Sequence, residues 1–547
     1  MTIASARIAG NPRVPEPVNE QARGYAPGSV EARSVLAAID AVKAAGVRDL
    51  PNVINGVRRP IGDSDPVVAP HEHALQLGRI PVASAEAVNA AIDAALAARH
   101  DWSRMDWQDR VAIFLRAAEL VNSKYRDELM ATTMLGQSKT FHQAEIDVNE
   151  LVDFFRYNVK LAEQIYTGQP FSVTGVHNVM DHRPLEGFVL ALTPFNFTAI
   201  AGNLPSTPAL MGNVVVWKPS EKSALSSDVV MRIFEEAGVP AGVINLVHGD
   251  GKLVTEVAQA SEHLAGISFT GSTAVFRDIW RGIATNLDIY RSYPRLVGET
   301  GGKNAVIAHP SADPQALLVA LVRGAFEYQG QKCSAASRAY IPRSLWRELR
   351  EPLIETTAGL VVGDVTRHET YVGAVIDDKA ADRLGAAFDR VKQSSDHEIL
   401  VGGSVSTDKG WFVEPTIVET TDPRSFVMSE EFFGPLLSVY IYEDEDWDQT
   451  LRLLDTTSQY ALTCSVFASD RIAINTALDV LRDNAGMTYI NDKPTGATMG
   501  QQSFGGSRGS GTNDKTGSVL ALQRWVSGRF IKENMTPDLD WTYPYMG

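Results

Sequence analysis

Short apolar runs alternate with stretches of helical spacing over much of the chain. Between residues 187 and 299 the runs GFVLAL, NVVVW, VINLV, GISF and RLVGE have the composition of strands. A helical segment over 224–237 separates two of them and stops before Gly238 and Pro240. Strands that alternate with helices predict crossover units and a parallel sheet, which binds its ligands at the carboxyl ends of the strands.

Apolar spacing also predicts structure on both sides of this region. Residues 106–166 carry apolar side chains three and four positions apart, which predicts helices. The alternation of strand and helix patterns resumes after Asn304, so we expect a second α/β domain there. Residues 1–80 are rich in proline and turn residues and are expected to wrap a surface rather than form a core. The tail from Val519 holds three strand-like patches, VLALQRWVS, RFIK and WTYPY, which suit an interface.

Composition narrows the class of protein. The chain has 547 residues, 44% of them apolar, which favours a globular protein of two or more domains. Its formal charge is −16 without a block of Lys and Arg, which argues against nucleic acid or an anionic membrane as the main partner. Residues 187–217 are uncharged, but Pro194, Pro205 and Pro208 interrupt them, so we expect no membrane span. Two cysteines and no apolar signal-peptide core predict a cytoplasmic protein.

The two cysteines have different surroundings. Cys464 lies in the strand-like run YALTCSVFAS, where a buried free cysteine acts as a small apolar residue. Cys333 lies in YQGQKCSAAS, among small and polar residues and directly after Lys332. We interpret that setting as accessible and electropositive, which favours a thiolate nucleophile. On local sequence alone, an inert loop cysteine remains the alternative.

Phosphate-binding candidates are individually weak, because the chain has neither a G-x-G-x-x-G fingerprint nor a complete P-loop. Gly251 ends a G-x-G sequence after VINLV, which a simple turn explains as well. Gly271 and Ser272 are better placed, since they follow the strand GISFT and open a helix. The free N–H groups at the start of that helix are suited to hold a pyrophosphate.

Charged residues at strand ends are further candidates. Lys218 and Glu221 follow NVVVW, and a glutamate there can accept hydrogen bonds from a ribose while repelling a 2′-phosphate; a solvated loop is the alternative. Glu299 ends RLVGE and is a candidate general base. The segment His71 to His73 (HEH) has no further ligand cluster beside it, so we expect a surface loop and no metal site.

Taken together, these candidates belong to six motifs. The motifs are TPFNF (193–197), WKPSE (217–221), FTGST (269–273), GETGGK (298–303), GQKCSA (330–335) and EEFFGP (430–435). In this order they resemble the NAD(P)-dependent aldehyde dehydrogenase superfamily, which uses a variant dinucleotide-binding domain and therefore lacks G-x-G-x-x-G. The segments VPEPVNE, YAPGS, YQGQKCSAASR and TGATMGQQSFGGSRGSGTNDKTG resemble the branch that oxidises L-glutamate γ-semialdehyde, the open form of Δ1-pyrroline-5-carboxylate. The resemblance covers nearly the whole chain.

The resemblance implies a fold and a division into parts. The fold is α/β, with a Rossmann-like NAD domain, a second α/β catalytic domain and a small β oligomerisation element. The expected parts are an N-terminal wrap and NAD-binding domain (1–166 and 187–299), a catalytic domain (300–511), and an oligomerisation hairpin with C-terminal strands (167–186 and 512–547).

It also implies a mechanism. Cys333 thiolate attacks the aldehyde carbon, and the Asn196 side chain and the Cys333 backbone N–H stabilise the oxyanion of the thiohemiacetal. Hydride transfer to NAD leaves a thioester. Water then hydrolyses the thioester with Glu299 as general base and releases L-glutamate, the second step of proline breakdown.

Motif positions imply the binding residues as well. For NAD they are Lys218, Ser220, Glu221, Gly251, Ser272, Glu431 and Phe433. Glu221 favours NAD over NADP because of its charge. For the substrate they are Ser334, Gly496 and Ala497 as the anchor of its carboxylate, with Phe197 and Phe504 as aromatic walls. A hydroxyl and backbone N–H groups can hold an anion without arginine. Simple core packing is the alternative for the two phenylalanines.

Partners and alternatives complete the expectation. The substrate is a small molecule, and the hairpin with the C-terminal strands predicts a homodimer or a higher homo-oligomer. The chain is too short for a fused proline dehydrogenase barrel, so we expect that enzyme to be a separate chain. Another semialdehyde dehydrogenase, such as one for succinate semialdehyde, is the closest alternative. A non-catalytic binding protein on the same fold is another, although Cys333, Asn196 and Glu299 occurring together speak against it.

Overall fold

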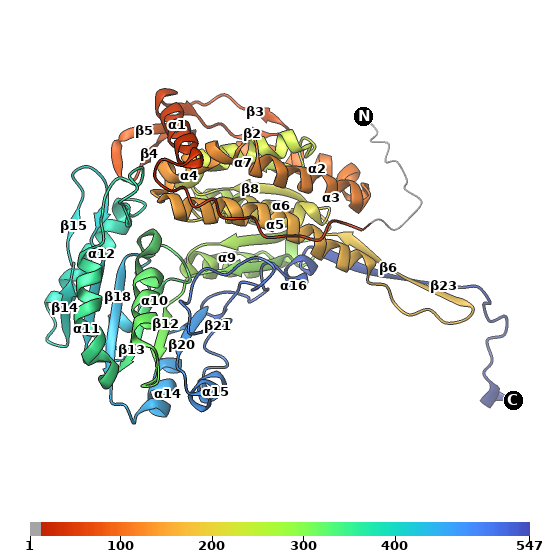
Figure 1. The fold of residues 1–547 in the computed structure, drawn as a ribbon. Coiled ribbons are helices and arrows are strands. Elements are labelled where there is room, and N and C mark those ends of the chain that lie inside the picture. Colours follow the sequence, from red (N-terminus) through yellow and green to blue (C-terminus); the bar gives the residue numbers. More distant parts are fainter. Residues whose placement is uncertain (1–12) are drawn as a thin grey trace.

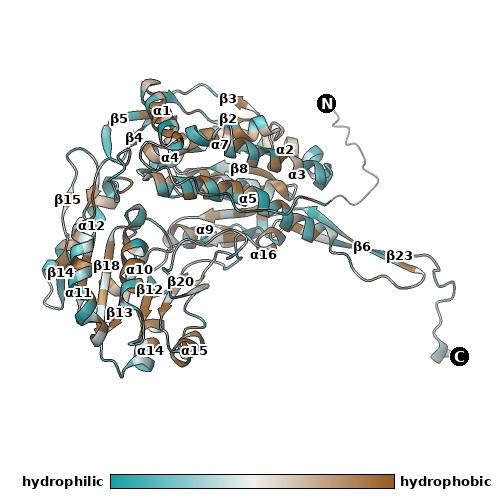
Figure 2. Ribbon diagram, in the orientation of Figure 1, coloured by the Kyte–Doolittle hydropathy of each residue, from teal (hydrophilic) through white to brown (hydrophobic). Residues whose placement is uncertain are grey.

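Two seven-stranded sheets covered by helices form the body of the molecule, and a two-stranded arm projects from it (Figure 1). The computed structural model describes residues 13–547, so the first part of the expected N-terminal wrap, residues 1–12, lies outside the described residues. Figure 2 shows apolar strands between helices whose outer faces are more polar. This is the layering expected when a parallel sheet is buried on both faces.

The first sheet contains every strand predicted between residues 187 and 299. In spatial order its strands are β11 (Arg295–Glu299), β10 (Leu264–Thr270), β7 (Phe188–Leu192), β8 (Val214–Lys218), β9 (Ile244–Leu246), β2 (Val53–Ile54) and β3 (Val57–Arg58). The strands from β11 to β9 are parallel, as predicted, and β2 joins β9 antiparallel. The chain therefore forms the expected Rossmann-like sheet.

Helices cover both faces of this sheet. They are α1 (Val30–Ala44), α2 (Ala85–Arg104), α3 (Trp107–Asn122), α4 (Arg126–Gln137), α5 (Phe141–Thr167), α6 (Thr198–Leu210), α7 (Ala224–Ala237), α8 (Gly251–Gln259) and α9 (Thr273–Thr285). The helices predicted over 106–166 and 224–237 are confirmed. α7 ends at Gly238, whose φ of +104° needs a residue without Cβ.

The second sheet follows the same rules. Its spatial order is β14 (His397–Val401), β17 (Thr416–Thr420), β18 (Leu436–Tyr442), β13 (Ala336–Pro342), β12 (Asn304–Ala308), β20 (Thr463–Phe467) and β21 (Met487–Ile490). Its helices are α10 (Pro314–Phe326), α11 (Arg343–Ala358), α12 (Asp378–Lys392), α13 (Phe426–Ser429), α14 (Trp447–Thr457) and α15 (Arg471–Val480). All neighbours except β14 and β17 are parallel. Cys464 is fully buried in β20, as predicted.

The arm consists of β6 (Val176–Pro184) and β23 (Val526–Asn534), which pair antiparallel along their whole length. The strand predicted from residue 519 is wrong at its start, because Val519–Gln523 forms helix α16. This helix packs on α5, and Leu522 and Trp525 are buried in the first domain. Short apolar runs do not distinguish a strand from a buried helix. The WTYPY patch forms no strand either and ends in a 3₁₀ turn over Pro544–Met546.

The N-terminal region is only partly a wrap. Residues 13–28 run over the surface, but Val35 of α1 and Val53 of β2 are fully buried in the first core. A small sheet of β1 (Arg48–Asp49), β5 (Glu72–Pro81) and β4 (Ser64–Ala69) follows. His71, expected in a surface loop, is 2% exposed because the turn between β4 and β5 is covered by the segment at Gly410. Within residues 13–547, no helix is both long and apolar enough to cross a bilayer.

Candidate active site

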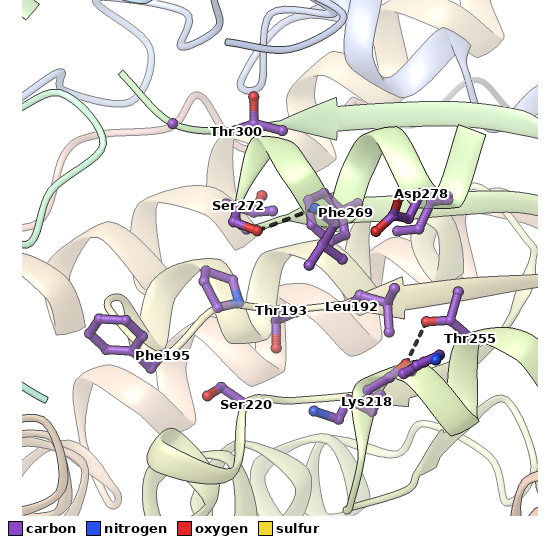
Figure 3. Close-up of a pocket in the computed structure, with 18 of the residues that line it drawn as sticks. Leu192, Thr193, Phe195, Lys218, Ser220, Thr255, Phe269, Ser272, Asp278 and Thr300 are labelled. Carbon is purple, nitrogen blue, oxygen red and sulfur yellow. Dashed lines mark hydrogen bonds between the residues drawn. The ribbon is translucent and has the colours of Figure 1, made fainter. Parts of the chain in front are cut away.

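A cleft of about 1180 Å³ opens across the carboxyl ends of β7, β8 and β10. The order of strands reverses here, since β7 is followed by β8 on one side and β10 lies on the other, and open α/β sheets bind ligands at such a point. The predicted site residues that line it are Asn196, Lys218, Ser220, Glu221, Gly251, Ser272, Cys333, Glu431 and Phe433. Figure 3 shows Lys218 and Ser220 on one wall and Ser272 and Phe269 on the opposite wall.

One wall carries a lysine and a glutamate that neutralise each other. The Lys218 Nζ donates to Glu221 Oε1 at 2.5 Å. Ser220 begins the short 3₁₀ helix over Glu221–Ser223, and its Oγ accepts from the backbone N–H of Lys222 at 3.3 Å. The pair leaves a carboxylate at the cleft that suits the two hydroxyls of a ribose and offers no net positive charge to a 2′-phosphate.

The opposite wall presents the start of a helix. Ser272 caps α9, and its Oγ accepts from the Val275 N–H at 3.3 Å (Figure 3). The start of α8 lies at the cleft as well, with Gly251 as its first residue; a Cβ there would lie 3.5 Å from Lys218 Nζ. Helix starts with free N–H groups attract anions, so this region fits the pyrophosphate of a dinucleotide.

The loop that brings Cys333 to the cleft is held tightly. Three consecutive residues before it, Tyr328, Gln329 and Gly330, have φ angles of +50°, +55° and +64°. The Gln329 Nε2 donates to two backbone carbonyls at 2.8 Å each, which maintains this unusual backbone. The Asn304 Nδ2 donates to the Cys333 carbonyl at 2.7 Å and to the Ala335 carbonyl at 2.9 Å. Asn304 was not predicted, and its place directly after GETGGK was the only signal.

Asn196 lies at the cleft with one side of its amide already fixed. Its Nδ2 donates to the Gln331 carbonyl at 3.1 Å, and its Oδ1 has no partner among the described residues. The helix that follows, α6, is anchored by Asp147, which accepts from the N–H groups of Thr198 and Ala199 at 2.9 and 2.8 Å. The buried Lys139 Nζ pairs with Asp147 at 2.7 Å. This supporting ion pair was not predicted, because no spacing pattern joins Lys139 to Asp147.

The electropositive setting predicted for Cys333 is wrong. The Lys332 Nζ donates to Glu327 at 3.1 Å within a buried ion pair, so its charge is neutralised away from the thiol. Burial and the nearby carboxylates of Glu299 and Glu431 raise the pKa of Cys333 well above its usual value. The prediction of accessibility is better, because the residue is half-buried and lines the cleft. Burial in this site therefore disfavours the thiolate form of Cys333.

Glu299 ends β11 beside this cysteine but lies behind the wall of the cleft. Its side chain is 6% exposed, and neither carboxylate oxygen has a partner among the described residues. Burial raises its pKa well above the usual value and Asp514 raises it further, while the nearby backbone N–H of Gly506 and the charge of Lys515 lower it. A Cβ on Gly505 would lie 3.0 Å from Glu299 Oε1, so the carboxyl group packs against the 505–515 segment. A buried carboxyl group of raised pKa suits proton transfer near neutral pH.

Glu431 and Phe433 close the cleft from the second domain. The Glu431 Oε1 accepts from the Gly302 N–H at 2.7 Å, and burial raises the pKa of Glu431 to about 7. A Cβ on Gly301 would overlap this carboxylate, which explains the glycine pair of GETGGK. Phe433 has a φ of +51°, and its ring lies edge-on to Phe195 with centroids 5.9 Å apart.

The residues predicted for the substrate lie outside the large cleft. Ser334 and Thr495 hydroxyl oxygens are 2.8 Å apart, which brings Gly496 and Ala497 next to the residue that follows Cys333. Gly496 has a φ of +96°, a left-handed conformation that favours a residue without Cβ. Thr495, Gly496 and Ala497 belong to a turn formed by residues 495–502, which is called the 495–502 loop below.

The two predicted aromatic walls have different neighbours. The Phe197 ring lies edge-on to Tyr328, and the Lys139 Nζ is 4.0 Å from its centroid. Phe504 pairs through its backbone with Thr516. The described contacts do not join Phe197 to Phe504, so a sandwich formed by them stays a prediction.

Glu150 of α5 was not predicted as a site residue. Burial and Asp147 raise its pKa to about 8, while Lys139 and Lys332 lower it. Burial therefore favours the neutral form of this carboxyl group. Its position, one helical turn after Asp147, was the available signal.

A dinucleotide-sized cleft and a cysteine carried into it by a second domain define a two-domain α/β oxidoreductase. The sequence profile of the aldehyde dehydrogenase family matches residues 61–530. The chain belongs to the aldehyde dehydrogenase family. This confirms the fold and the enzyme class predicted from the motifs.

Individual relatives are similar to this chain over nearly their whole length. Delta-1-pyrroline-5-carboxylate dehydrogenase of Agaricus bisporus is 46% identical over 99% of both chains. The mitochondrial enzyme of the same name from Homo sapiens is 45% identical over 96% of this chain and 94% of its own. The crystal structure of the Mycobacterium tuberculosis delta-pyrroline-5-carboxylate dehydrogenase bound with NAD matches with a TM-score of 0.95, at 50% identity, over 99% of this chain and 100% of that one.

Proposed function

We propose that this protein oxidises L-glutamate γ-semialdehyde, formed by hydrolysis of Δ1-pyrroline-5-carboxylate, to L-glutamate with NAD as the oxidant. The aldehyde, NAD⁺ and water give the carboxylate, NADH and protons. One observation carries the proposal: Cys333 lines the same cleft as the Lys218–Glu221 pair and the start of α9. The substrate is inferred from the names of the relatives, since the Agaricus, human and mycobacterial proteins are all named as dehydrogenases of pyrroline-5-carboxylate.

The cysteine and its neighbours begin the reaction. The Cys333 sulfur bonds to the aldehyde carbon, and the carbonyl oxygen becomes an oxyanion. The free N–H of the Asn196 amide and the Cys333 backbone N–H are the donors that stabilise it. Because the Gln331 carbonyl already fixes the Asn196 amide, little reorganisation is needed at the moment of reaction.

The residues of the cleft fit NAD. Glu221 takes the adenine ribose, the start of α9 takes the pyrophosphate, and Glu431 with Phe433 faces the nicotinamide end. When bound, NAD accepts a hydride from the carbon held by Cys333. The positive charge of the oxidised nicotinamide also favours the thiolate, which burial disfavours. Glu299 then accepts a proton from the water that attacks the thioester, and L-glutamate leaves.

The carboxylate of the substrate's amino acid head has a matching site. Ser334 with the backbone at Gly496 and Ala497 holds the carboxylate, because a hydroxyl and N–H groups suit an anion. Phe197 and Phe504 are proposed to contact the short aliphatic chain of the substrate.

The test is NADH production by the purified protein. L-Glutamate γ-semialdehyde should be oxidised with a higher kcat/KM than succinate semialdehyde, which carries a carboxylate but no ammonium group. A preference for succinate semialdehyde would contradict the role of the 495–502 loop in recognising an amino acid. Absence of NADH formation from either aldehyde would favour the binding protein.

The oligomeric state and the cellular location are also proposals. The exposed apolar side chains Phe171, Phe530 and Ile531 of the arm region favour burial against a second copy, in a homodimer or a larger homo-oligomer. Light scattering of the protein with and without Phe530→Ser and Ile531→Ser tests this. We also propose a cytoplasmic protein, consistent with two free cysteines, that receives its substrate from a separate proline dehydrogenase. The human relative is named mitochondrial, so fractionation of the source cells decides the location.

A further inference from the structure

A segment near the N-terminus contacts the 495–502 loop, although the two are more than 470 residues apart in the sequence. Residues 13–24 lie along α5 and are attached to it by several polar contacts. The backbone N–H of Glu20 donates to Asp153 at 2.8 Å, and Arg156 pairs with Glu20 at 2.9 Å. The segment therefore has a fixed position on the helix, from which it can support a neighbouring loop.

The amide of Asn19 makes every hydrogen bond that such a group can make. Its Nδ2 donates to Asp153 Oδ2 and to the Met499 carbonyl, both at 2.8 Å. Its Oδ1 accepts from the Tyr157 hydroxyl and from Gln501 Nε2, both at 3.2 Å. Two donors and two lone pairs are used, so Asn19 joins α5 to the 495–502 loop in one geometry.

The far end of the loop is shaped to meet this contact. The N–H groups of Gln501 and Gln502 both donate to the Thr498 carbonyl at 3.0 Å, which makes a tight turn. Gly500 has a φ of +83°, and a Cβ there would overlap the ring of Tyr157. Met499 is 5% exposed and packs over Gly517. A loop this compact transmits a displacement of Met499 to Gly496 and Ala497.

We infer that Asn19 is a positioning residue for substrate selection: it fixes the 495–502 loop so that Gly496 and Ala497 meet the carboxylate of the substrate. The other end of the loop is held by the contact between Thr495 and Ser334. The 495–502 loop is thus held at one end by Ser334, next to Cys333, and at the other end by Asn19 of the N-terminal segment. Asn19 acts through the loop and touches neither NAD nor the reacting carbon. The inference rests on the proposed function.

The experiment compares two aldehydes in the variant Asn19→Ala. L-Glutamate γ-semialdehyde carries the carboxylate that the loop holds, and butanal keeps the reacting carbonyl without it. Loss of two short hydrogen bonds predicts a KM for the semialdehyde that is about tenfold higher, with kcat and the KM for NAD changed by less than about twofold. The kcat/KM for butanal should stay within about twofold of that of the parent protein.

A matched control and a milder variant accompany it. Gln21→Ala removes an exposed side chain of the same segment that bonds only to the Asn19 carbonyl, and both substrates should be unaffected. Gln501→Ala removes one long hydrogen bond from the loop side and should raise the KM for the semialdehyde about threefold. In the double variant with Asn19→Ala this second effect should vanish, since its partner is already gone. Gln501→Ala also decides the matter if Asn19→Ala does not fold.

Two results overturn the inference without touching the proposed function. One is an equal loss with both aldehydes, which means that Asn19 only stabilises the protein. The other is an unchanged KM for the semialdehyde in Asn19→Ala and in Gln501→Ala. A parent protein that does not prefer the semialdehyde to butanal instead contradicts the proposed function itself, whatever the variants do.

Discussion

The dinucleotide cleft and the region around Cys333 are built in different ways. The cleft takes its polar residues from strand ends and helix starts, and it holds a paired charge, Lys218 with Glu221. The cysteine region is assembled from distant segments, and it includes the buried carboxyl group of Glu299, whose pKa is raised. The first region binds with fixed charges, and the second can move protons. Substitutions in the second region should therefore lower the catalytic rate far more than substitutions in the first.

The largest effect is expected from Cys333→Ser. A serine hydroxyl ionises far less readily than a thiol, so NADH formation should fall at least about 10⁴-fold while NAD still binds. Stopped-flow NADH absorbance measures the first property, and calorimetric titration with NAD measures the second. Cys464→Ser is the matched control and should leave kcat unchanged per folded molecule, since that residue lies buried in β20 away from the cleft.

Glu299→Gln should lower kcat by about 10²–10⁴-fold, the usual contribution of a general base. Glu299 works as a base only when deprotonated, and burial raises its pKa. In the parent protein kcat should thus rise with pH until that pKa is passed, and the glutamine variant should lose this rise. Retention of the same pH profile in the variant would assign the titration to another group. Glu256→Gln, on the cleft but away from Cys333, is the control.

Asn196→Ala should lower kcat by about 10²–10³-fold with little change in KM, because one oxyanion donor is removed. Steady-state kinetics with both parameters resolved provides the measurement. Asn286→Ala, another asparagine on the cleft, should change kcat little. An increase of KM alone in Asn196→Ala would indicate binding of the substrate rather than stabilisation of the oxyanion.

Glu221→Ala tests the binding region and should have the smallest effect. Removal of the carboxylate frees Lys218, which then attracts a 2′-phosphate, so the preference for NAD over NADP should fall about tenfold, or roughly 1.4 kcal/mol. The ratio of kcat/KM values for the two cofactors is the readout. Glu256→Ala lines the same cleft and should leave this ratio where it was.

The same contrast explains what could be predicted from the sequence. Ser272, Lys218 and Glu221 were predictable because each lies at or shortly after the carboxyl end of a strand, and parallel strands bring these ends together. Asn304 and Asn19 were not, because their partners come from segments far along the chain, and spacing carries no information about such contacts.

Errors arose where a neighbour in the sequence was taken for a neighbour in space. Lys332 adjoins Cys333, yet its side chain pairs with Glu327. Val519–Gln523 has strand composition, yet it forms a helix because burial against α5 outweighs a weak local preference. Glu299 was predicted as a general base from its place at a strand end, but its burial against Gly505 could not be read from that place.

The central claim is that Cys333 and the dinucleotide act on one carbon in one cleft. Mass spectrometry of the acid-quenched Glu299→Gln protein tests it most directly, because slow hydrolysis should let the thioester accumulate. With L-glutamate γ-semialdehyde and NAD together, we predict a glutamyl adduct on the peptide that contains Cys333, in step with one NADH per site. No adduct should form when NAD is omitted. NADH formation without a modified Cys333, or an adduct on another residue, would contradict the account.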